Sequence, residues 1–221
     1  MISADIAIVL PELLLAAYAM LALLFGVYTG KDATATLITW VTAVVMVLLA
    51  FWIGLGGGTR LAFGGMFIDD AFSRFAKAVI LISGAFVLVM GRDYLAKHDL
   101  LRFEYPVLFA LATVGMMGMV SAGDLMSLYL GLELQSLALY VLAAIRRDNL
   151  KSTEAGLKYF VLGSLSSGML LYGASLVYGY TGSTNFAVIG QALAEQVTVG
   201  PLIGLVFLFA GLAFKISAAP F

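Results

Sequence analysis

The sequence predicts an all-α protein: a polytopic bundle of about seven transmembrane helices. Hydrophobic residues make up 62% of the 221 residues and charged residues only 11%, whereas a soluble domain carries about 25% charged residues. The apolar runs, of about 20 residues each, match the thickness of a bilayer. Because lipid offers no partner for backbone amides and carbonyls, each run is expected to form a regular helix.

The apolar runs place the predicted helices along the chain, with turn-forming residues between them. The N-terminus lacks the positively charged segment of a secretory signal, so the first run is interpreted as a retained helix. A short piece at 186–197 is expected to lie at the membrane interface. The predicted transmembrane helices cover residues 5–29, 34–55, 73–96, 104–121, 124–145, 154–180 and 201–215 onward.

The end of the chain is unusual, because the residues after Lys215 carry no polar flank and no charged anchor. We therefore expect the chain to stop within a helix and to be a fragment of a longer protein. Pro220 cannot donate a backbone hydrogen bond to the carbonyl of Ile216, and its ring clashes with that group. The seventh helix is predicted to be broken just after Lys215.

The basic residues of the predicted loops fall mainly on one side of the bundle, which predicts the orientation, because loops rich in Lys and Arg stay in the cytoplasm. The N-terminus is therefore expected outside. The cytoplasmic set of loops holds Lys31, Arg92, Lys97, Arg102, Arg146, Arg147 and Lys151, and the opposite set holds Arg60, Arg74 and Lys77.

Composition also excludes several classes of function. The net charge is −1 and no basic block is present, so binding to nucleic acid through counterion release is dismissed. The chain has no cysteine and one histidine, His98, in a charged loop. Iron–sulfur clusters require cysteine thiolates, and haems mostly require His, Cys or Met ligands. We therefore expect the chain to bind no metal and no redox cofactor of its own.

Glu133 is the first candidate for chemistry. It lies nine residues into the fifth predicted helix, about 13 Å along it, near the bilayer midplane. A charge at that depth costs about 2.5 to 3.5 kcal/mol on insertion scales, so the carboxylate needs a proton or a cation. Tyr129, Ser136 and Tyr140 share its helix face. These three residues either line a hydrated path or belong to an interfacial tyrosine belt.

Lys215 and Lys158 are the two candidate amines. Lys215 lies roughly 20 Å along a helix that begins at Pro201, at the predicted break, where a helix C-terminus favours a cation. Transporters place broken helices of this kind at midplane ion sites, and a lysine that snorkels from a short helix is the alternative. Lys158 lies about one turn inside the sixth helix. It either carries a proton between Glu133 and a neighbouring site or reaches the headgroups.

A carboxylate and an amine at these depths can act as a switch. At 4 Å and an effective dielectric constant near 20, the two charges attract by about 4 kcal/mol, which offsets most of the insertion cost. Separating them favours protonation of Glu133 and proton loss from Lys215. We therefore expect the two residues to form a coupled pair that converts movement into proton uptake and release.

Other polar residues have simpler interpretations. Ser164, Ser167 and Gly168 lie on one face of the sixth predicted helix and are expected to allow close packing of helices, with a polar water path as the alternative. Asp69 and Asp70 are expected in a solvated loop on the outer side. Glu12 has no evident partner in the sequence.

Four segments of the sequence resemble the subunit N family of respiratory complex I, the proton-pumping NADH:quinone oxidoreductase. These segments are 105–109 (YPVLF), 123–136 (GDLMSLYLGLELQS), 154–160 (EAGLKYF) and 212–221 (LAFKISAAPF). The resemblance spans the whole chain and keeps the order of the motifs. It implies the fold of an antiporter-like membrane subunit, built from two inverted repeats.

By motif position, the resemblance implies that Glu133, Lys158 and Lys215 are the proton-translocation residues of the fifth, sixth and seventh helices. It divides the chain into three N-terminal transmembrane helices (1–103) and an incomplete first antiporter-like repeat (104–221). The three additional N-terminal helices imply a bacterial inner membrane, with plant or fungal mitochondria as the alternative. The implied partners are the lipid bilayer and the other antiporter-like and small membrane subunits of complex I.

The function implied is proton translocation coupled to electron transfer, in an enzyme whose NADH, FMN, iron–sulfur clusters and quinone are bound elsewhere. Two alternatives stay open. The chain could belong to a multisubunit cation/proton antiporter, which uses a similar Glu and Lys pair. It could also be a non-conducting scaffold, in which the buried charges only lock helices together.

Overall fold

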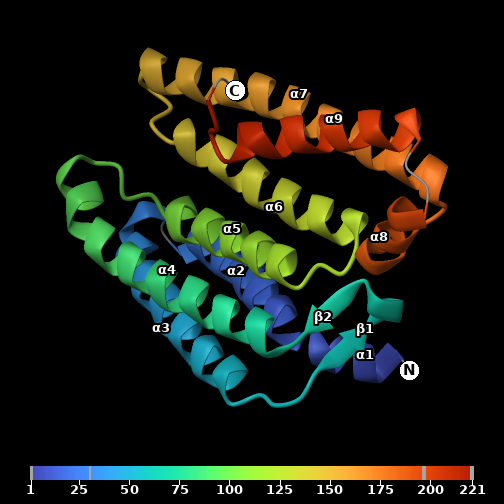
Figure 1. Ribbon diagram of the computed structural model, residues 1–221. Helices are drawn as coiled ribbons and strands as arrows, with labels where there is room; N and C mark the ends of the chain where they lie inside the picture. Colours follow the sequence, from blue (N-terminus) through green and yellow to red (C-terminus); the bar gives the residue numbers. More distant parts are fainter. Residues whose placement is uncertain (1, 30, 196–197, 220–221) are drawn as a thin grey trace.

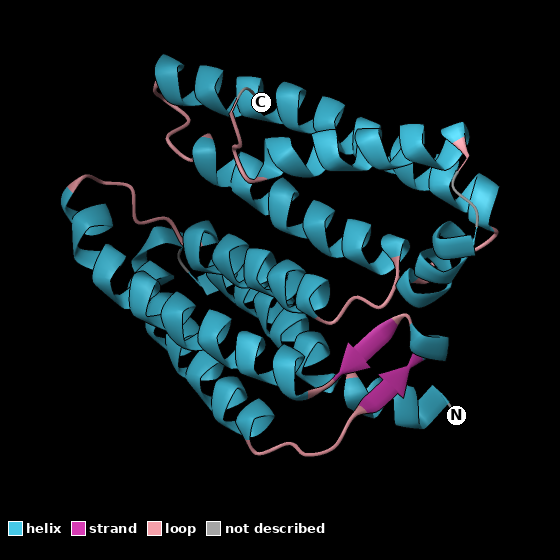
Figure 2. Ribbon diagram, viewed as in Figure 1, coloured by secondary structure: helices cyan, strands magenta, loops and turns pink. Residues whose placement is uncertain are grey.

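The computed structural model describes residues 2–29, 31–195 and 198–219, and these residues are mostly helical (Figures 1 and 2). The α-helices are α1 (Ile2–Ile8), α2 (Leu10–Thr29), α3 (Ala35–Gly54), α4 (Ala71–Lys97), α5 (Glu104–Val120), α6 (Leu125–Ala143), α7 (Leu150–Thr181), α8 (Phe186–Glu195) and α9 (Val199–Lys215). The remaining elements are the 3-10 helices η1 (Lys31–Thr34) and η2 (Phe63–Gly65) and the strands β1 (Arg60–Ala62) and β2 (Phe67–Asp69).

The predicted helices are present as α2 to α7 and α9, and the short predicted piece as α8. The first apolar run is divided at Val9 into α1 and α2, because Pro11 has no amide to donate to the carbonyl of Ala7. Five described segments are long and apolar enough to cross a membrane, namely α2, Asp32–Gly54, α4, α6 and α7. α5 and α9 have 17 residues each, or about 26 Å, slightly less than the hydrocarbon core.

The hairpin formed by β1 and β2 was not predicted. Its two antiparallel strands pair Arg60 with Asp69 and Ala62 with Phe67, and the connection turns through Gly64 and Gly65, both at positive φ. Strands of three residues are too short to show an alternating pattern in the sequence. The hairpin lies at the end of the bundle that also holds α1 (Figure 2).

Two hydrophobic cores hold the helices together. The first joins α2, α3, α4 and α5 through fully buried side chains such as Leu15, Met46 and Leu81. The second joins α6 to α9 around Leu170 and Leu208. Figure 1 shows α5 at the edge of the first group, next to α6, while α7 and α9 lie side by side. The bundle therefore consists of two packed groups that meet at α5 and α6.

Glycines bring helix backbones into direct contact at two places. A Cβ atom added to Gly131 of α6 would lie 2.8 Å from the backbone nitrogen of Met119 on α5. A Cβ atom added to Gly173 of α7 would lie 2.6 Å from the carbonyl oxygen of Gly204 on α9. Small residues permit this close approach of helices in membranes. The α5–α6 and α7–α9 pairs are therefore packed backbone against backbone.

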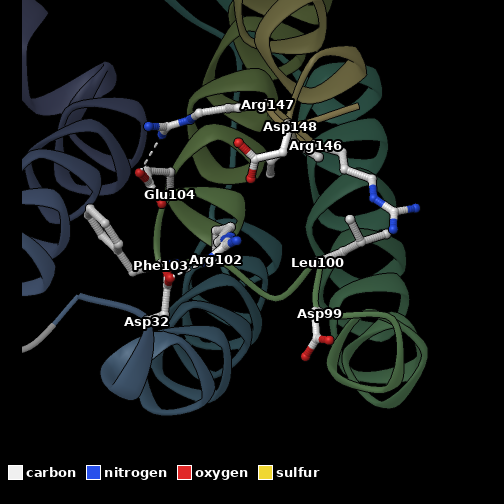
Figure 3. Close-up of a pocket in the computed structure, with 10 residues that line it drawn as sticks. Asp32, Asp99, Leu100, Arg102, Phe103, Glu104, Arg146, Arg147 and Asp148 are labelled. Atoms are coloured by element: carbon white, nitrogen blue, oxygen red, sulfur yellow. Dashed lines mark hydrogen bonds and ion pairs between the residues drawn. The ribbon is translucent and has the colours of Figure 1, made fainter. Parts of the chain in front are cut away.

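Loops of the two predicted sets gather at opposite ends of the bundle. At the hairpin end, the amide of Ile68 donates to the carbonyl of Ser121 (2.8 Å), and the amide of Leu125 donates to the carbonyl of Thr184 (2.9 Å). At the other end, Arg102 pairs with Asp32, and Arg147 pairs with Glu104 at 2.8 Å. These charges line an open cavity of about 420 Å³ (Figure 3).

The expectation of a solvated loop is wrong for Asp69. Its carboxylate is buried and accepts hydrogen bonds from Arg60 Nη2 (2.7 Å) and Arg74 Nη1 (3.2 Å). Asp70 instead caps α4, where it accepts a hydrogen bond from the amide of Ser73 (2.7 Å). That bond favours the ionised carboxylate and lowers the pKa of Asp70.

A substitution at the α5–α6 contact tests this packing. We expect Gly131→Ala to lower the free energy of unfolding by about 1 to 3 kcal/mol, because the new methyl group meets backbone atoms that cannot move aside. The measurement is the thermal unfolding of the purified full-length protein in detergent. Gly168→Ala is the matched control, since no atom lies within 4 Å of its added Cβ. An equal effect of the two substitutions would contradict the close packing.

Candidate functional site

Glu133 is part of α6, and its side chain contacts the neighbouring helices α7 and α9. The start of α6 is fixed by Asp124, whose side chain accepts a hydrogen bond from the amide of Ser127 (2.7 Å). Glu133 is the ninth residue of the helix, about 12 Å from its start. The hydroxyl of Ser167 on α7 donates a hydrogen bond to Glu133 Oε1. The carboxylate therefore faces the interior of the second helix group.

Lys215 lies opposite this carboxylate, at the last residue of α9. Its ammonium group is 3.5 Å from Glu133 Oε1. It donates hydrogen bonds to Ser136 Oγ (2.7 Å) and to the Tyr140 hydroxyl (3.2 Å), both on α6. The side chains of Lys215 and Glu133 are 13% and 21% exposed. The site thus combines one acid, one amine and three hydroxyl groups.

The end of α9 positions the amine. The amide of Ser217 donates to the carbonyl of Phe214 (3.0 Å), and the amide of Ala218 donates to that of Ala213 (2.9 Å). This is the Schellman arrangement, with Ser217 in the left-handed conformation at φ 54°. The helix therefore ends at Lys215, as predicted. Pro220, to which the break was attributed, lies outside the described residues.

The electrostatics of the pair follow from this distance. At 3.5 Å and an effective dielectric constant near 20, the two charges attract by about 5 kcal/mol. The helix C-terminus adds a favourable interaction with the cation. Because Ser136 and Tyr140 accept hydrogen bonds from the ammonium group, they stabilise its charged form. The arrangement thus compensates the charge of the acid and of the amine within the helix bundle.

Glycine makes room for the tyrosine of the site. Gly163 of α7 faces the ring of Tyr140, and an added Cβ would lie 2.6 Å from Cζ. The ring also packs edge-to-face against Tyr159, at 4.7 Å between centroids. The hydroxyl of Tyr140 is thereby held toward Lys215.

Lys158 does not join this group of residues. Its ammonium group pairs with Glu154, one turn earlier on α7, at 2.5 Å, and the lysine side chain is 69% exposed. Among the described residues, Glu133 and Lys215 are thus brought together, and Lys158 lies on the outer face of the bundle. Tyr129, one turn before Glu133, packs against the second hydrophobic core.

Sequence reasoning favoured a packing role for Ser167, with a polar path as the alternative, and did not predict its contact with Glu133. Its hydroxyl is directed at Glu133, whereas Gly168 faces open space. The available signal was Gly163 four residues before Ser167, on the same face of a helix that follows the one bearing Glu133. Within the described residues, no group of three or more His, Cys, Asp or Glu side chains could hold a metal ion.

Comparison with known proteins reveals similarity along the whole chain. Residues 122–221 match the family model described as NADH:quinone oxidoreductase/Mrp antiporter, TM. The NADH-quinone oxidoreductase subunit N of Rhodobacter capsulatus is 64% identical over 222 residues, covering 100% of this chain and 46% of that protein. The corresponding protein of Jannaschia sp. (strain CCS1) is 63% identical, with the same coverage. The chain spans about half the length of these curated relatives.

Solved structures share the fold. A chain of respiratory complex I from Thermus thermophilus aligns with a TM-score of 0.77 and 29% identity, covering 96% of this chain and 45% of that chain. A chain of the Mrp complex from Dietzia sp. DQ12-45-1b aligns with a TM-score of 0.71 and 22% identity, covering 100% of this chain and 42% of that chain.

A double-mutant cycle tests the Glu133–Lys215 interaction. We expect Glu133→Gln and Lys215→Met each to lower the free energy of unfolding. The loss in the double variant should be smaller than the sum of the two single losses, by about 0.5 to 3 kcal/mol. Thermal unfolding of the full-length protein in detergent measures these effects. The exposed pair Arg147 and Glu104 provides a control cycle, with an expected coupling of about 0.2 to 1 kcal/mol. Strict additivity at Glu133 and Lys215 would refute the interaction.

Proposed function

Because the chain belongs to the family of antiporter-like N subunits of NADH-quinone oxidoreductases, we propose that it moves protons across the membrane, driven by electron transfer elsewhere in the complex. The supporting observation is the pairing of Glu133 with Lys215 inside the helix bundle at 3.5 Å. Acids and amines within membrane-spanning helices are rare and mark proton relays and ion pathways.

The mechanism uses the distance between the two side chains. When α6 and α9 hold the pair together, the carboxylate is ionised and the amine keeps its proton. When the pair separates, Lys215 releases a proton, and Glu133 takes one up to avoid an uncompensated buried charge. The hydroxyls of Ser136, Ser167 and Tyr140 offer hydrogen-bond partners to both groups during this change. Movement of the helices is thereby coupled to proton transfer.

The proposed role of Lys158 rests on its sequence motif alone. We propose that it passes protons between this site and the next proton-carrying group. An ammonium group with 69% exposure is costly in lipid. Protein or water beyond the described residues would therefore meet it in the assembled enzyme.

We propose that other subunits bind the NADH, FMN, iron–sulfur clusters and quinone of the enzyme. The residues present do not suit iron–sulfur clusters, because the chain has no cysteine. The proposed partners are the antiporter-like and small membrane subunits of the complex. The proposed location is the bacterial inner membrane. We propose that residues 1–103 form the N-terminal helices and that residues 104–221 belong to the first antiporter-like repeat.

The antiporter alternative is supported by the family model, whose description includes Mrp antiporters. The curated relatives, at 63 to 64% identity, favour the oxidoreductase. A sodium-dependent proton flux in the absence of NADH would favour the antiporter instead. Normal pumping after neutralisation of Glu133 would favour a scaffold.

Neutral variants test the proposed function. In the assembled oxidoreductase in proteoliposomes, we expect Glu133→Gln and Lys215→Met each to slow proton pumping at least about tenfold at a given rate of NADH oxidation, because a positioned acid or base contributes ~10²- to 10⁴-fold to proton transfer. A pH-sensitive dye in the lumen measures the pumping. Arg92→Gln, at the exposed end of α4, is the control. Pumping at the wild-type rate in both site variants would reject the proposal.

Cysteine labelling tests the orientation. We expect Gly57→Cys to react with a membrane-impermeant thiol reagent added outside intact cells, and Lys97→Cys to react only after permeabilisation, because positive loops stay inside. The 221 residues contain no natural cysteine, so each introduced cysteine is the single thiol in this part of the protein that the reagent can label. The opposite labelling pattern would show that the N-terminus faces the cytoplasm.

A further inference from the structure

A second buried ion pair lies in the N-terminal helices, away from the site described above. Glu12 of α2 and Lys77 of α4 approach to 2.6 Å, and their side chains are 6% and 3% exposed. Glu12 was expected to lack an evident partner and Lys77 to lie in the outer loops, and this ion pair between α2 and α4 shows that both expectations are wrong. Neither oxygen of Glu12 accepts a hydrogen bond of normal geometry within the described part of the chain.

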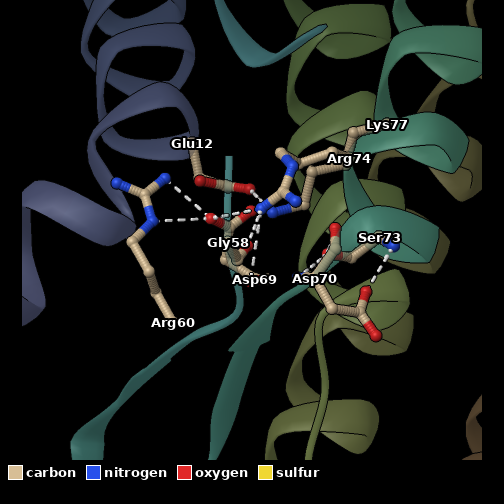
Figure 4. A network of polar contacts seen from close by, with 8 residues as sticks. All are labelled: Glu12, Gly58, Arg60, Asp69, Asp70, Ser73, Arg74 and Lys77. Atoms are coloured by element: carbon tan, nitrogen blue, oxygen red, sulfur yellow. Dashed lines mark hydrogen bonds and ion pairs between the residues drawn. The ribbon is translucent and has the colours of Figure 1, made fainter. Parts of the chain in front are cut away.

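The charged residues near Glu12 and Lys77 form a separate group of ion pairs. Asp69 on β2 is held by Arg60 on β1 and by Arg74 on α4 (Figure 4). Arg74 also donates to the carbonyl of Gly58 (2.7 Å). These three side chains carry one excess positive charge, and α3 contributes only uncharged side chains next to them. This charged group borders the same cavity as Lys77.

Lys77 is almost fully buried but borders a cavity. Together with Arg60, Asp69 and Arg74, it lines a cavity of about 220 Å³ next to Trp52 and Ile53 of α3. This volume accommodates several water molecules, and the charged lining offers them partners. Arg60, at 48% exposure, lies where the lining reaches the surface. On the other side, the ammonium group is 4.5 Å from the centroid of the Phe67 ring.

We propose that Lys77 is a second proton-exchange site, at which an ammonium group held by Glu12 passes a proton to water in this cavity. In the step, one N–H bond of the ammonium group breaks and the water molecule becomes hydronium, leaving a neutral amine beside the Glu12 carboxylate. The reverse step reloads the amine. This inference rests on the proposed proton translocation and adds a site outside the antiporter-like repeat.

Lys77→Arg tests the proposal, because arginine keeps the charge and the ion pair but does not release its proton. We expect the assembled oxidoreductase carrying Lys77→Arg to keep its subunits and its rate of NADH oxidation, and to pump protons at least about twofold more slowly. We also expect the pumping rate to lose part of its dependence on pH, which a purely structural role would not change. The variant Glu12→Gln/Lys77→Met, in which no buried charge is left unpaired, should show the same defect.

The outcomes separate this inference from the proposed function. Wild-type pumping in Lys77→Arg, with pumping lost in Glu133→Gln, would overturn the second site alone. Wild-type pumping in both variants would overturn the proposed function as well.

Access of water to the cavity provides a test that holds even where Lys77→Arg fails to assemble. Ile53 lines the cavity, whereas Leu49, one turn deeper on α3 and equally buried, does not. We expect Ile53→Cys to react with a small hydrophilic thiol reagent at least about tenfold faster than Leu49→Cys, because only a hydrated thiol ionises readily. Equal rates would show a dry cavity and overturn the proposal.

Discussion

A charge that leaves water for the interior of a membrane protein needs an opposite charge within a few ångströms, and this constraint organises both helix groups of the chain. Glu133 and Lys215 satisfy this constraint at a distance of 3.5 Å, with hydroxyl groups of α6 and α7 completing the site. Glu12 and Lys77 meet it at 2.6 Å. Removal of one partner from such a pair leaves an uncompensated charge. Each pair therefore links two helices through their side chains.

The helical fold could be predicted from the sequence to a large extent, because a bilayer requires long apolar segments and regular backbone. The break at Val9 and the hairpin were not predicted. Pro11 gave a signal for the break, but the apolar run continues across it. The hairpin depends on long-range contacts, such as the backbone hydrogen bond from Ile68 to Ser121. A local sequence pattern does not predict such contacts.

The candidate site could be predicted in part. Glu133 and Lys215 were found because a charge in an apolar run is visible in the sequence, and Ser136 and Tyr140 followed from helical spacing. Ser167 was missed because its partner lies on another helix. The pairing of Glu12 with Lys77 was missed for the same reason, since α2 and α4 are separated by a helix and a hairpin. The outward direction of Lys158 depends on the rotation of α7, which an apolar helix with a weak polar face does not specify.

The hairpin connects the two charged regions physically. One of its strands carries Asp69 of the Arg60–Asp69–Arg74 group, and its turn receives the amide of Gly123 and the hydroxyl of Ser127 at the start of α6. The position of α6, and with it Glu133, is thus linked to the outer ends of α2 and α4.

The glycine contacts have a mechanical consequence. The backbones that touch at Gly131 and at Gly173 leave no space for a larger side chain, so the α5–α6 pair and the α7–α9 pair are each closely packed. α6 also packs against α7, through the second hydrophobic core and the contact of Gly163 with Tyr140. Glu133 and Lys215 belong to different pairs, so a small rotation of one pair relative to the other would change the 3.5 Å distance between their charged groups.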